Sequence, residues 1–287
     1  MILVIDIGGT NVKYGLVDNG ALIRKNVVKT EISSKEDLVT LVKGILKSFE
    51  DVRITRLSFS FPGIINDEGV LIRAGALACL DGLNFKEYLE YETGFIVHIE
   101  NDARCAAIAE VNSGNAVGKK DVVVMTVGTG IGGGVIVDGK VLKGHGFKAG
   151  ELGMMLLDRD YVTLHQKAST SALIDYYNKG MNTLIDHASI ILDTYDTDLK
   201  CRKIVDEWLG SLCIAIFNSV STLNPELVLL GGGISAHPKF INLVKQKMNE
   251  NPYWIDFSCE IDTCQYYNDA GMMGAYFNAI GGENNVL

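Results

Sequence analysis

Apolar and polar positions recur along the chain with two periods, one typical of strands and one typical of helices. The opening run Ile2–Ile5 and the alternating stretch Val12–Val17 predict an antiparallel hairpin that opens a sheet. A helix that Ser33 or Ser34 caps is expected next. The same patterns then predict strands over 54–61, 95–100 and 226–230, and helices over 103–110, 202–223, 238–249 and 270–280. Strands that alternate with helices indicate an α/β architecture.

The opening hairpin has a counterpart 120 positions further along the chain. The stretch Val4-Ile5-Asp6-Ile7-Gly8-Gly9-Thr10 corresponds to Val124-Met125-Thr126-Val127-Gly128-Thr129-Gly130. Each copy reads as strand, glycine turn, strand and turn, which predicts a duplicated lobe, with chance similarity of two hairpins as the alternative. We expect an N-terminal lobe over 1–116 and a C-terminal lobe over 117–272, with a final helix over about 273–287 that returns to the first lobe.

Composition and charge narrow the class of protein. A chain of 287 residues has the length of two domains. Its net charge of −9 argues against a nucleic-acid partner, because an acidic surface repels phosphate backbones. The N-terminus has no basic region and only a short apolar run, so we expect neither a signal peptide nor a membrane span and place the protein in the cytoplasm. The six scattered cysteines indicate reduced thiols rather than a disulfide framework.

Three glycine turns are candidates for phosphate binding, because glycine lets backbone N–H groups come close to a ligand. In the first, Asp6-Ile7-Gly8-Gly9-Thr10, Thr10 adds a hydroxyl and Asp6 can hold a hydrated Mg²⁺. The second, Gly128–Gly134, has five glycines in seven residues, more than a plain turn needs. The third, Gly231-Gly232-Gly233, follows a strand and can receive an adenine ring. The first and the third also fit an ordinary glycine turn.

Two acids, Asp102 and Glu151, are candidates for sugar binding and catalysis. Asn101 and Asp102 follow a predicted strand, at the edge where open α/β sheets bind ligands. Either residue can cap the next helix, and a cap needs only one of them, so one side chain stays available. An aspartate there can accept a proton from a hydroxyl. Glu151 lies in a glycine-rich loop, where it binds hydroxyls or is simply a solvated acid.

Taken together, these motifs resemble the ROK family (repressor, open reading frame, kinase) of the hexokinase and actin-like ATPase superfamily, over nearly the whole chain. The resembling stretches are Asp6–Thr10, Gly128–Gly134, Glu100-Asn101-Asp102-Ala103, Ala149-Gly150-Glu151-Leu152-Gly153, and Asn224-Pro225-Glu226 through Ser235. The resemblance implies a two-lobed actin-like (ribonuclease-H-like) fold, with duplicated βββαβα-type lobes around a central cleft.

The resemblance also implies roles for individual residues. Asp102 would be the catalytic base, and sugar hydroxyls would bind to Asn101, Asp102, Glu151, Gly75 and His165. Phosphates and nucleotide would bind to Asp6, Gly8, Gly9, Thr10, Lys13, Gly128, Thr129, Gly130, Gly232 and Gly233, with Mg²⁺ held by Asp6 through water. The implied reaction is phosphoryl transfer from ATP to a hydroxyl, expected to be the 6-hydroxyl, of a hexose or hexoside.

Two departures from the family pattern bear on the substrate. The family usually has a histidine after Glu-Ile-Gly that binds zinc and contacts the sugar near its anomeric carbon, and this chain has Met154 there. The family's cysteine-rich zinc loop is also missing, so no zinc site is expected. A β-glucoside kinase, an N-acetylmannosamine kinase and a glucokinase all remain open at this point.

Two other functions compete with a kinase. A repressor of this family would carry a DNA-binding segment ahead of the first glycine motif, and we expect none because the first strand begins at Ile2. A non-catalytic sugar-binding or regulatory homologue is the second, and the acid at Asp102 argues against it. We expect ATP and a sugar as ligands, no nucleic-acid or membrane partner, and a homodimer.

Overall fold

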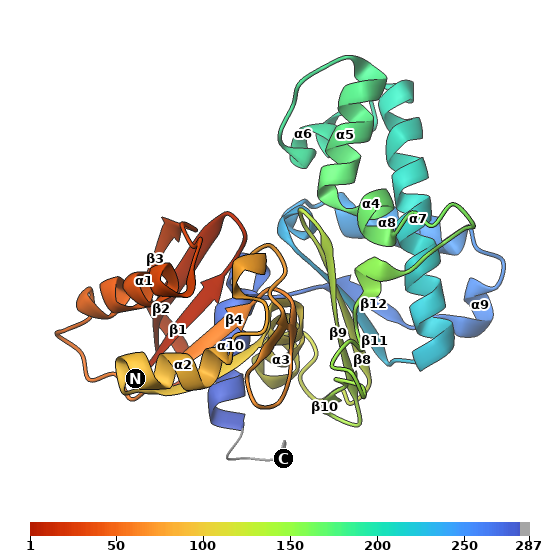
Figure 1. The fold of residues 1–287 in the computed structure, drawn as a ribbon. Helices are drawn as coiled ribbons and strands as arrows, with labels where there is room; N and C mark the ends of the chain where they lie inside the picture. The colour runs from red at the N-terminus through yellow and green to blue at the C-terminus, as the bar shows by residue number, and fades with distance from the viewer. Residues whose placement is uncertain (282–287) are drawn as a thin grey trace. The chain divides into compact units, whose positions relative to one another are not determined.

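The structure is a computed structural model that describes residues 1–281. The chain divides into two compact units (Figure 1). The first is formed by residues 1–112, 143–149 and 269–281, and the second by residues 113–142 and 150–268. These junctions lie four residues from the lobe boundaries expected at 116/117 and 272/273, and the expected last helix includes residues 282–287, which lie outside the described residues. No sequence pattern indicates that the short segment 143–149 belongs to the first unit.

The first unit is built on a five-stranded sheet with the strand order β3-β2-β1-β4-β7. Its strands are β1 (Ile2–Ile7), β2 (Asn11–Asp18), β3 (Ala21–Lys29), β4 (Arg56–Phe61) and β7 (Ile96–Asn101). Its helices are α1 (Lys35–Lys47), α2 (Phe85–Thr93), α3 (Asp102–Ser113) and α10 (Ala270–Gly281). The short elements β5 (Ile64–Ile65), β6 (Leu71–Arg73) and η1 (Ala78–Leu80) lie between β4 and α2 in sequence. Ser34 caps α1, as one of the two predicted caps.

The side chains of β4 explain how this sheet is covered on both faces. Leu57, Phe59 and Phe61 are fully buried in a core that includes residues of α1 and α2. Ser58 alternates with them, and its hydroxyl donates a 2.6 Å hydrogen bond to the Ala275 carbonyl of α10. Small side chains on this second face therefore let a helix approach the sheet closely.

Helix α10 is also in close contact with α3, the helix that begins at Asp102. A Cβ atom added to Gly274 would lie 1.8 Å from the Cys105 carbonyl oxygen. Because the obstructing atom is backbone, no side-chain rotation can relieve the clash. The position of α3 in the first unit thus depends on a glycine in α10.

The second unit repeats the sheet and adds a helical layer. Its sheet has the order β10-β9-β8-β11-β12, with β8 (Val122–Val127), β9 (Ile131–Val137), β10 (Lys140–Val141), β11 (Leu227–Gly231) and β12 (Glu260–Thr263). The helices are α4 (Leu164–Ala168), α5 (Thr170–Met181), α6 (Ala188–Thr194), α7 (Leu199–Leu223), α8 (Phe240–Asn249) and α9 (Trp254–Phe257), with short turns η2 (Leu152–Met154) and η3 (Gly233–Ala236). A last turn, η4 (Tyr267–Asp269), precedes α10.

The two sheets have one topology, which confirms the duplicated α/β lobes predicted from the hairpin repeat. In each, a three-stranded antiparallel ribbon is extended by two parallel strands. Strands β1 and β8 begin and end 120 positions apart. The glycine turn that follows each of them is closed by a backbone hydrogen bond, from Gly8 to Asn11 in the first and from Gly128 to Gly130 in the second.

Helix α7 lies in the core of the second unit, although part of its surface is exposed to solvent. Its carboxylate cap Asp198 accepts hydrogen bonds from two backbone N–H groups, and Trp208 is 1% exposed. Ile214, in contrast, is 50% exposed. By length and composition α7 is the one helix among residues 1–281 that could span a membrane, and half of that apolar stretch is buried inside the protein.

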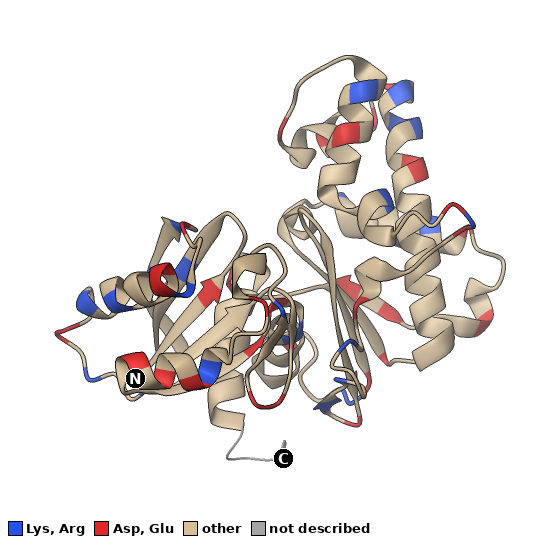
Figure 2. Cartoon of the chain, viewed as in Figure 1, with Lys and Arg blue, Asp and Glu red and all other residues tan. Residues whose placement is uncertain are grey.

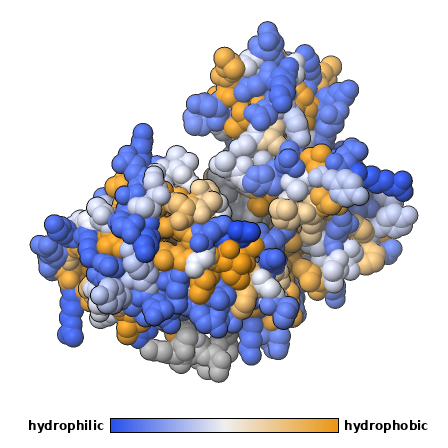
Figure 3. Space-filling model, in the orientation of Figure 1, coloured by the Kyte–Doolittle hydropathy of each residue, from blue (hydrophilic) through white to orange (hydrophobic). Residues whose placement is uncertain are grey.

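The surface mixes charges of both signs. Acidic side chains are interspersed with basic ones over both units (Figure 2), a distribution unfavourable for binding a phosphate backbone. Hydrophobic side chains also reach the surface (Figure 3), and Leu184 and Ile255 of the second unit are 98% and 82% exposed. All six cysteines are free thiols, as expected.

Two glycine-to-alanine changes in the first unit should have opposite effects on stability. Gly274→Ala overpacks the α10–α3 contact and should lower the free energy of unfolding by at least about 2 kcal/mol. Gly44→Ala, in α1, meets no atom within 4 Å and should raise it by about 0.5–1 kcal/mol, because alanine favours the helix. Thermal and urea unfolding measure both, and a Gly274→Ala protein as stable as wild type would contradict the packing described here.

Candidate active site

In the first unit, the parallel strands bring the predicted acids to one edge of the sheet. Asp6 of β1 is paired with Ser60 of β4, and Ser60 with Glu100 of β7. Neighbouring strands are about 4.8 Å apart, so Asp6 and Glu100 are separated by roughly 10 Å. Burial raises the pKa of the neighbouring Cys105 thiol well above its ordinary value, and the Glu100, Asp6 and Asp102 carboxylates raise it further. The edge is therefore strongly acidic.

Asp6 is held by partners on two other strands. Its Oδ1 accepts a 2.6 Å hydrogen bond from the Ser60 hydroxyl, and its Oδ2 lies 3.3 Å from Lys13 Nζ. The side chain is 15% exposed. A Cβ on Gly271, in the first turn of α10, would lie 2.5 Å from Asp6 Oδ1, so the positive end of that helix faces the carboxylate.

The first glycine turn is fixed by its neighbours while its tip stays open. Gly8 donates its N–H to the Asn11 carbonyl at 3.0 Å and accepts the Thr30 hydroxyl at 2.7 Å. Gly9 and Thr10 are exposed. A Cβ on Gly9 would lie 3.0 Å from Ala76 Cβ, so the turn lies beside the loop that contains Gly75. The structure thus brings the Gly75 loop next to the phosphate-binding candidates.

Asn101 and Asp102 divide two tasks between them. Asn101 is 7% exposed, accepts the Arg104 N–H at 3.0 Å as the cap of α3, and donates to the Gly63 carbonyl at 2.9 Å. Asp102 is exposed, and its Oδ1 accepts the N–H of the next residue, Ala103, at 2.8 Å. Asn101 is therefore the cap of α3, and Asp102 is the exposed acid beside it.

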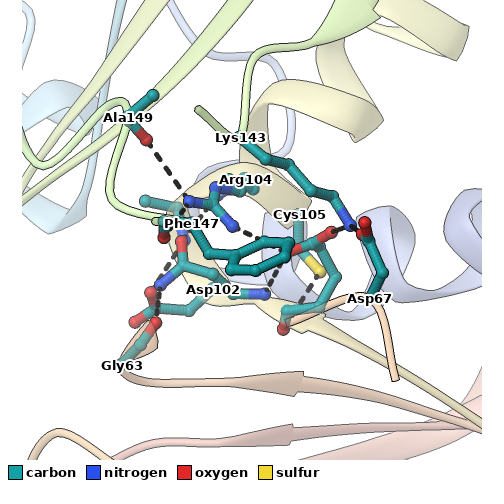
Figure 4. Close-up of polar contacts among 11 residues, drawn as sticks. Gly63, Asp67, Asp102, Arg104, Cys105, Lys143, Phe147 and Ala149 are labelled. Atoms are coloured by element: carbon teal, nitrogen blue, oxygen red, sulfur yellow. Dashed lines mark hydrogen bonds and ion pairs between the residues drawn. The ribbon is translucent and has the colours of Figure 1, made fainter. Parts of the chain in front are cut away.

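Glu100, the residue directly before Asn101, is a buried acid that two cations neutralise (Figure 4). Glu100 is 2% exposed, and its carboxylate lies 3.4 Å from Arg104 Nη1 and 2.9 Å from Lys143 Nζ. Lys143 also pairs with Asp67 at 2.9 Å. Burial by itself lowers the pKa of Lys143, but the Glu100 and Asp67 carboxylates outweigh it, so the pKa is raised above its usual 10.5. Lys143 therefore stabilises the fold fully at neutral pH, and this contribution is lost only as the pH rises through the raised pKa.

Arg104 joins Glu100 to the segment 143–149. Its guanidinium donates to the carbonyl oxygens of Phe147 and Ala149 at 2.7 and 3.3 Å (Figure 4). Arg104 is 2% exposed. Removing one partner of a buried ion pair costs about 3–5 kcal/mol, so the Glu100–Arg104 pair is a strong constraint on this region.

In the second unit, the glycine turn at Gly128–Gly130 is supported by a histidine. His165 Nδ1 accepts the Ile131 N–H at 3.3 Å, and a Cβ on Gly130 would lie 2.3 Å from the imidazole Cε1. The Gly128 carbonyl accepts the Thr170 N–H at 2.8 Å. Thr129, at the tip, is exposed. The structure thus places His165, a predicted sugar ligand, against the second glycine turn.

The third glycine turn lies against the second one. Gly232 has a φ of +88°, which favours glycine, and a Cβ there would lie 2.2 Å from the carbonyl oxygen of Val127, the residue before Gly128. No atom lies within 4 Å of a Cβ placed on Gly233. The phosphate and adenosine candidates of the second unit are therefore neighbours, with open space beside Gly233.

Glu151 and Met154 lie at the two ends of the short turn η2. Both are exposed, Met154 to 63%. Close backbone contacts hold the turn against β9, since a Cβ on Gly153 would lie 2.2 Å from the Ile131 carbonyl oxygen. Glu151 is thus fixed near the start of β9, the strand that follows the second glycine turn.

A metal site formed by protein side chains needs a cluster of His, Cys, Asp or Glu residues. Residues 1–281 contain no group of three or more His, Cys, Asp or Glu side chains that could hold a metal ion. Asp6 fits a hydrated Mg²⁺, because each of its oxygens keeps a lone pair after bonding Ser60 or Lys13 and can accept a hydrogen bond from metal-bound water.

The site residues predicted from the sequence are divided between the two units. The first unit holds Asp6, Gly8, Gly9, Thr10, Lys13, Gly75, Asn101 and Asp102, and the second holds Gly128, Thr129, Gly130, Glu151, His165, Gly232 and Gly233. Sequence reasoning missed Ser60, Arg104 and Lys143. The one available signal was the spacing of four between Glu100 and Arg104, which is easily taken for a surface helix pair.

Comparisons with known proteins agree with this arrangement. The family model described as "ROK family" matches residues 2–280. The β-glucoside kinase of Listeria monocytogenes is 31% identical, over 99% of this chain and 98% of that protein. The structure of the Lmo2764 protein from Listeria monocytogenes has a TM-score of 0.90 at 31% identity, covering 99% of both chains. The ROK hexokinase of Thermus thermophilus has a TM-score of 0.84 at 25% identity, also covering 99% of both.

These similarities extend over both units and confirm the actin-like two-lobed fold that the motifs implied. They cover the chain from the first strand to the last helix, so no large part is left without a counterpart. The chain belongs to the ROK family.

Proposed function

We propose that this protein is an ATP-dependent sugar kinase that transfers the γ-phosphoryl group of Mg·ATP to a primary hydroxyl, the 6-hydroxyl, of a hexoside. The observation that carries the proposal is the exposed carboxylate of Asp102 beside the buried cap Asn101, at the carboxyl edge of a sheet whose first strand ends in the Asp6–Thr10 turn. The β-glucoside kinase and hexokinase among the relatives support the same reaction class.

Asp102 acts as the general base. Its carboxylate accepts the proton of the sugar hydroxyl as the hydroxyl oxygen forms a bond to the γ-phosphorus, and the bond from that phosphorus to the β-phosphate oxygen breaks, releasing ADP. Glu151 and the Gly75 loop bind other sugar hydroxyls. Asn101 orients the base through its cap on α3.

The nucleotide binds to the glycine turns. The N–H groups of Gly9, Thr10 and Thr129 donate hydrogen bonds to phosphate oxygens. The adenosine binds on the open side of Gly233. Mg²⁺, held by Asp6 through water, supplies charge neutralisation for the phosphates. Lys13 offsets the charge of Asp6 and contributes a further cation.

The substrate is a β-glucoside rather than free glucose. Met154 is 63% exposed and offers only a weak acceptor where the family has a histidine. An apolar position selects weakly against an added group, whereas a hydrogen-bonding position rejects an altered hydroxyl strongly. Two relatives at 31% and 29% identity are β-glucoside kinases. The Lmo2764 structure is described as a candidate N-acetylmannosamine kinase, which makes that sugar the main rival. A cytoplasmic homodimer remains our expectation.

Replacing the base should abolish turnover with little effect on the fold. Asp102→Asn should lower kcat about 10²–10⁴-fold while sugar binding persists, because a general base contributes that much. Asp198→Asn is the matched control, an acid at the start of another helix where asparagine caps equally well. Steady-state kinetics and sugar titration measure both. A variant at residue 102 that keeps more than about a tenth of wild-type turnover would refute the assignment.

The second glycine turn should govern ATP binding. Gly130→Ala forces the His165 ring away and breaks its bond to the Ile131 N–H, so we expect the KM for ATP to rise at least about tenfold with the sugar KM nearly unchanged. His165→Ala loses the same bond, so the double variant should be little worse than either single one. Effects that multiply in the double variant would contradict this coupling.

Substrate preference should depend on residue 154. The wild-type kcat/KM for a β-glucoside should exceed or match that for glucose and for N-acetylmannosamine. Met154→His restores a hydrogen-bonding group and should shift the ratio of kcat/KM for the β-glucoside to kcat/KM for glucose toward glucose by roughly tenfold or more. A wild-type enzyme that prefers free glucose by more than about a hundredfold over both other sugars would rule out the β-glucoside assignment.

A further inference from the structure

The buried guanidinium of Arg104 has no part in the proposed chemistry, yet it contacts the residues around the base. A long charged side chain is rarely buried unless its polar atoms are bound. Arg104 donates to Glu100 and to the carbonyls of Phe147 and Ala149. It therefore joins the strand–helix junction of β7 and α3 to the segment 143–149.

On the junction side, the contacts form a closed set around Asp102. The Glu100 carboxylate bonds the Arg104 side chain and also accepts the Asn101 N–H at 2.8 Å. The Asn101 side chain in turn accepts the Arg104 N–H at 3.0 Å. Asp102 lies between these residues in the chain, so these contacts fix the backbone on both sides of it.

On the other side, the segment 143–149 has an unusual backbone. Phe147 has a φ of +57°, in the left-handed region that aromatic residues rarely adopt, and Gly144 and Gly150 have φ of +71° and +87°. The Ala149 N–H closes the segment on the Lys143 carbonyl at 3.0 Å. Such a conformation persists where surrounding contacts impose it, and Arg104 binds the Phe147 carbonyl itself.

The segment leads directly to a proposed sugar ligand. Ala149, whose carbonyl Arg104 binds, is followed by Gly150 and Glu151. Lys143, at the other end of the segment, binds Glu100 from the opposite direction. The two ends are thus fixed on the same buried carboxylate, one through Lys143 and one through Arg104.

We propose that Arg104 is a positioning residue for sugar phosphorylation, which holds the junction carrying Asp102 to the segment that precedes Glu151. The inference rests on the proposed kinase function. Arginine suits the task because its planar group donates to several acceptors in fixed directions, whereas a lysine ammonium cannot reproduce that fork. Arg104→Lys therefore keeps the charge beside Glu100 and loses the paired carbonyl contacts.

The kinetic test compares Arg104→Lys and Arg104→Met with Arg56→Lys. Arg56 also donates to a backbone carbonyl of the first unit, that of Ala279 at 2.8 Å, away from the junction. We expect Arg104→Lys to raise the sugar KM about tenfold and to lower kcat/KM for the sugar about 10²-fold, with the KM for ATP within about twofold. Arg104→Met should be worse, and Arg56→Lys should match wild type. Sugar kinetics within twofold of wild type in a folded Arg104→Lys protein would overturn the proposal.

A second readout needs no substrate. Amide hydrogen exchange of Phe147 and Ala149 in the ligand-free protein should be at least about tenfold faster in Arg104→Lys and unchanged in Arg56→Lys. Unchanged exchange at these amides would overturn the proposal whatever the kinetics. If the proposed function itself is wrong, the wild-type protein will phosphorylate none of the tested sugars, a β-glucoside, glucose and N-acetylmannosamine. An active wild type that is insensitive to Arg104→Lys contradicts this inference alone.

Discussion

A carboxylate buried near the end of β7, the outermost strand of the first sheet, has to be neutralised, and the carboxyl ends of the neighbouring strands are organised around that requirement. Glu100 is 2% exposed and would be very costly without its partners. Arg104 and Lys143 supply the charge, and the Asn101 N–H supplies a further hydrogen bond. Since Lys143 and the carbonyl groups bound by Arg104 all belong to residues 143–149, neutralising Glu100 also fixes this segment in the first unit.

The repeated topology has been adapted differently in the two units. In the first, the carboxyl edge of the sheet carries acids, with Asp6, Glu100 and Asp102 on or next to neighbouring strands. In the second, Thr126 corresponds to Asp6, and glycines follow β8 and β11. Acids suit a hydrated cation and proton transfer, while exposed backbone N–H groups suit anionic phosphates. One repeated strand pattern therefore carries both kinds of group, acids in the first unit and exposed backbone N–H groups in the second.

The sequence predicted those parts of the fold that local pattern determines. The hairpin repeat, the Ser34 cap and the strands before Asp102 and Gly231 all follow from short-range periodicity and capping. Strand β3 was missed because almost all of its side chains are exposed, which leaves no apolar alternation to detect. The role of the segment 143–149 could not be predicted either, because its partners Glu100 and Arg104 lie some forty residues earlier and the ion pair leaves no periodic signal. The contact of His165 with the second glycine turn could not be predicted, because it depends on the absence of a side chain at Gly130, 35 positions earlier.

The contrast between Glu100 and Asp102 assigns their chemistry. The two acids are two residues apart at one strand–helix junction, yet one is buried between cations and the other is exposed. Glu100 is paired with Arg104 and Lys143 and accepts a backbone N–H, so its carboxylate is fully engaged in holding the fold together. Asp102 is exposed to solvent, and its Oδ1 accepts the Ala103 N–H. The different environments of these neighbouring acids support a structural role for Glu100 and the proposed role of general base for Asp102.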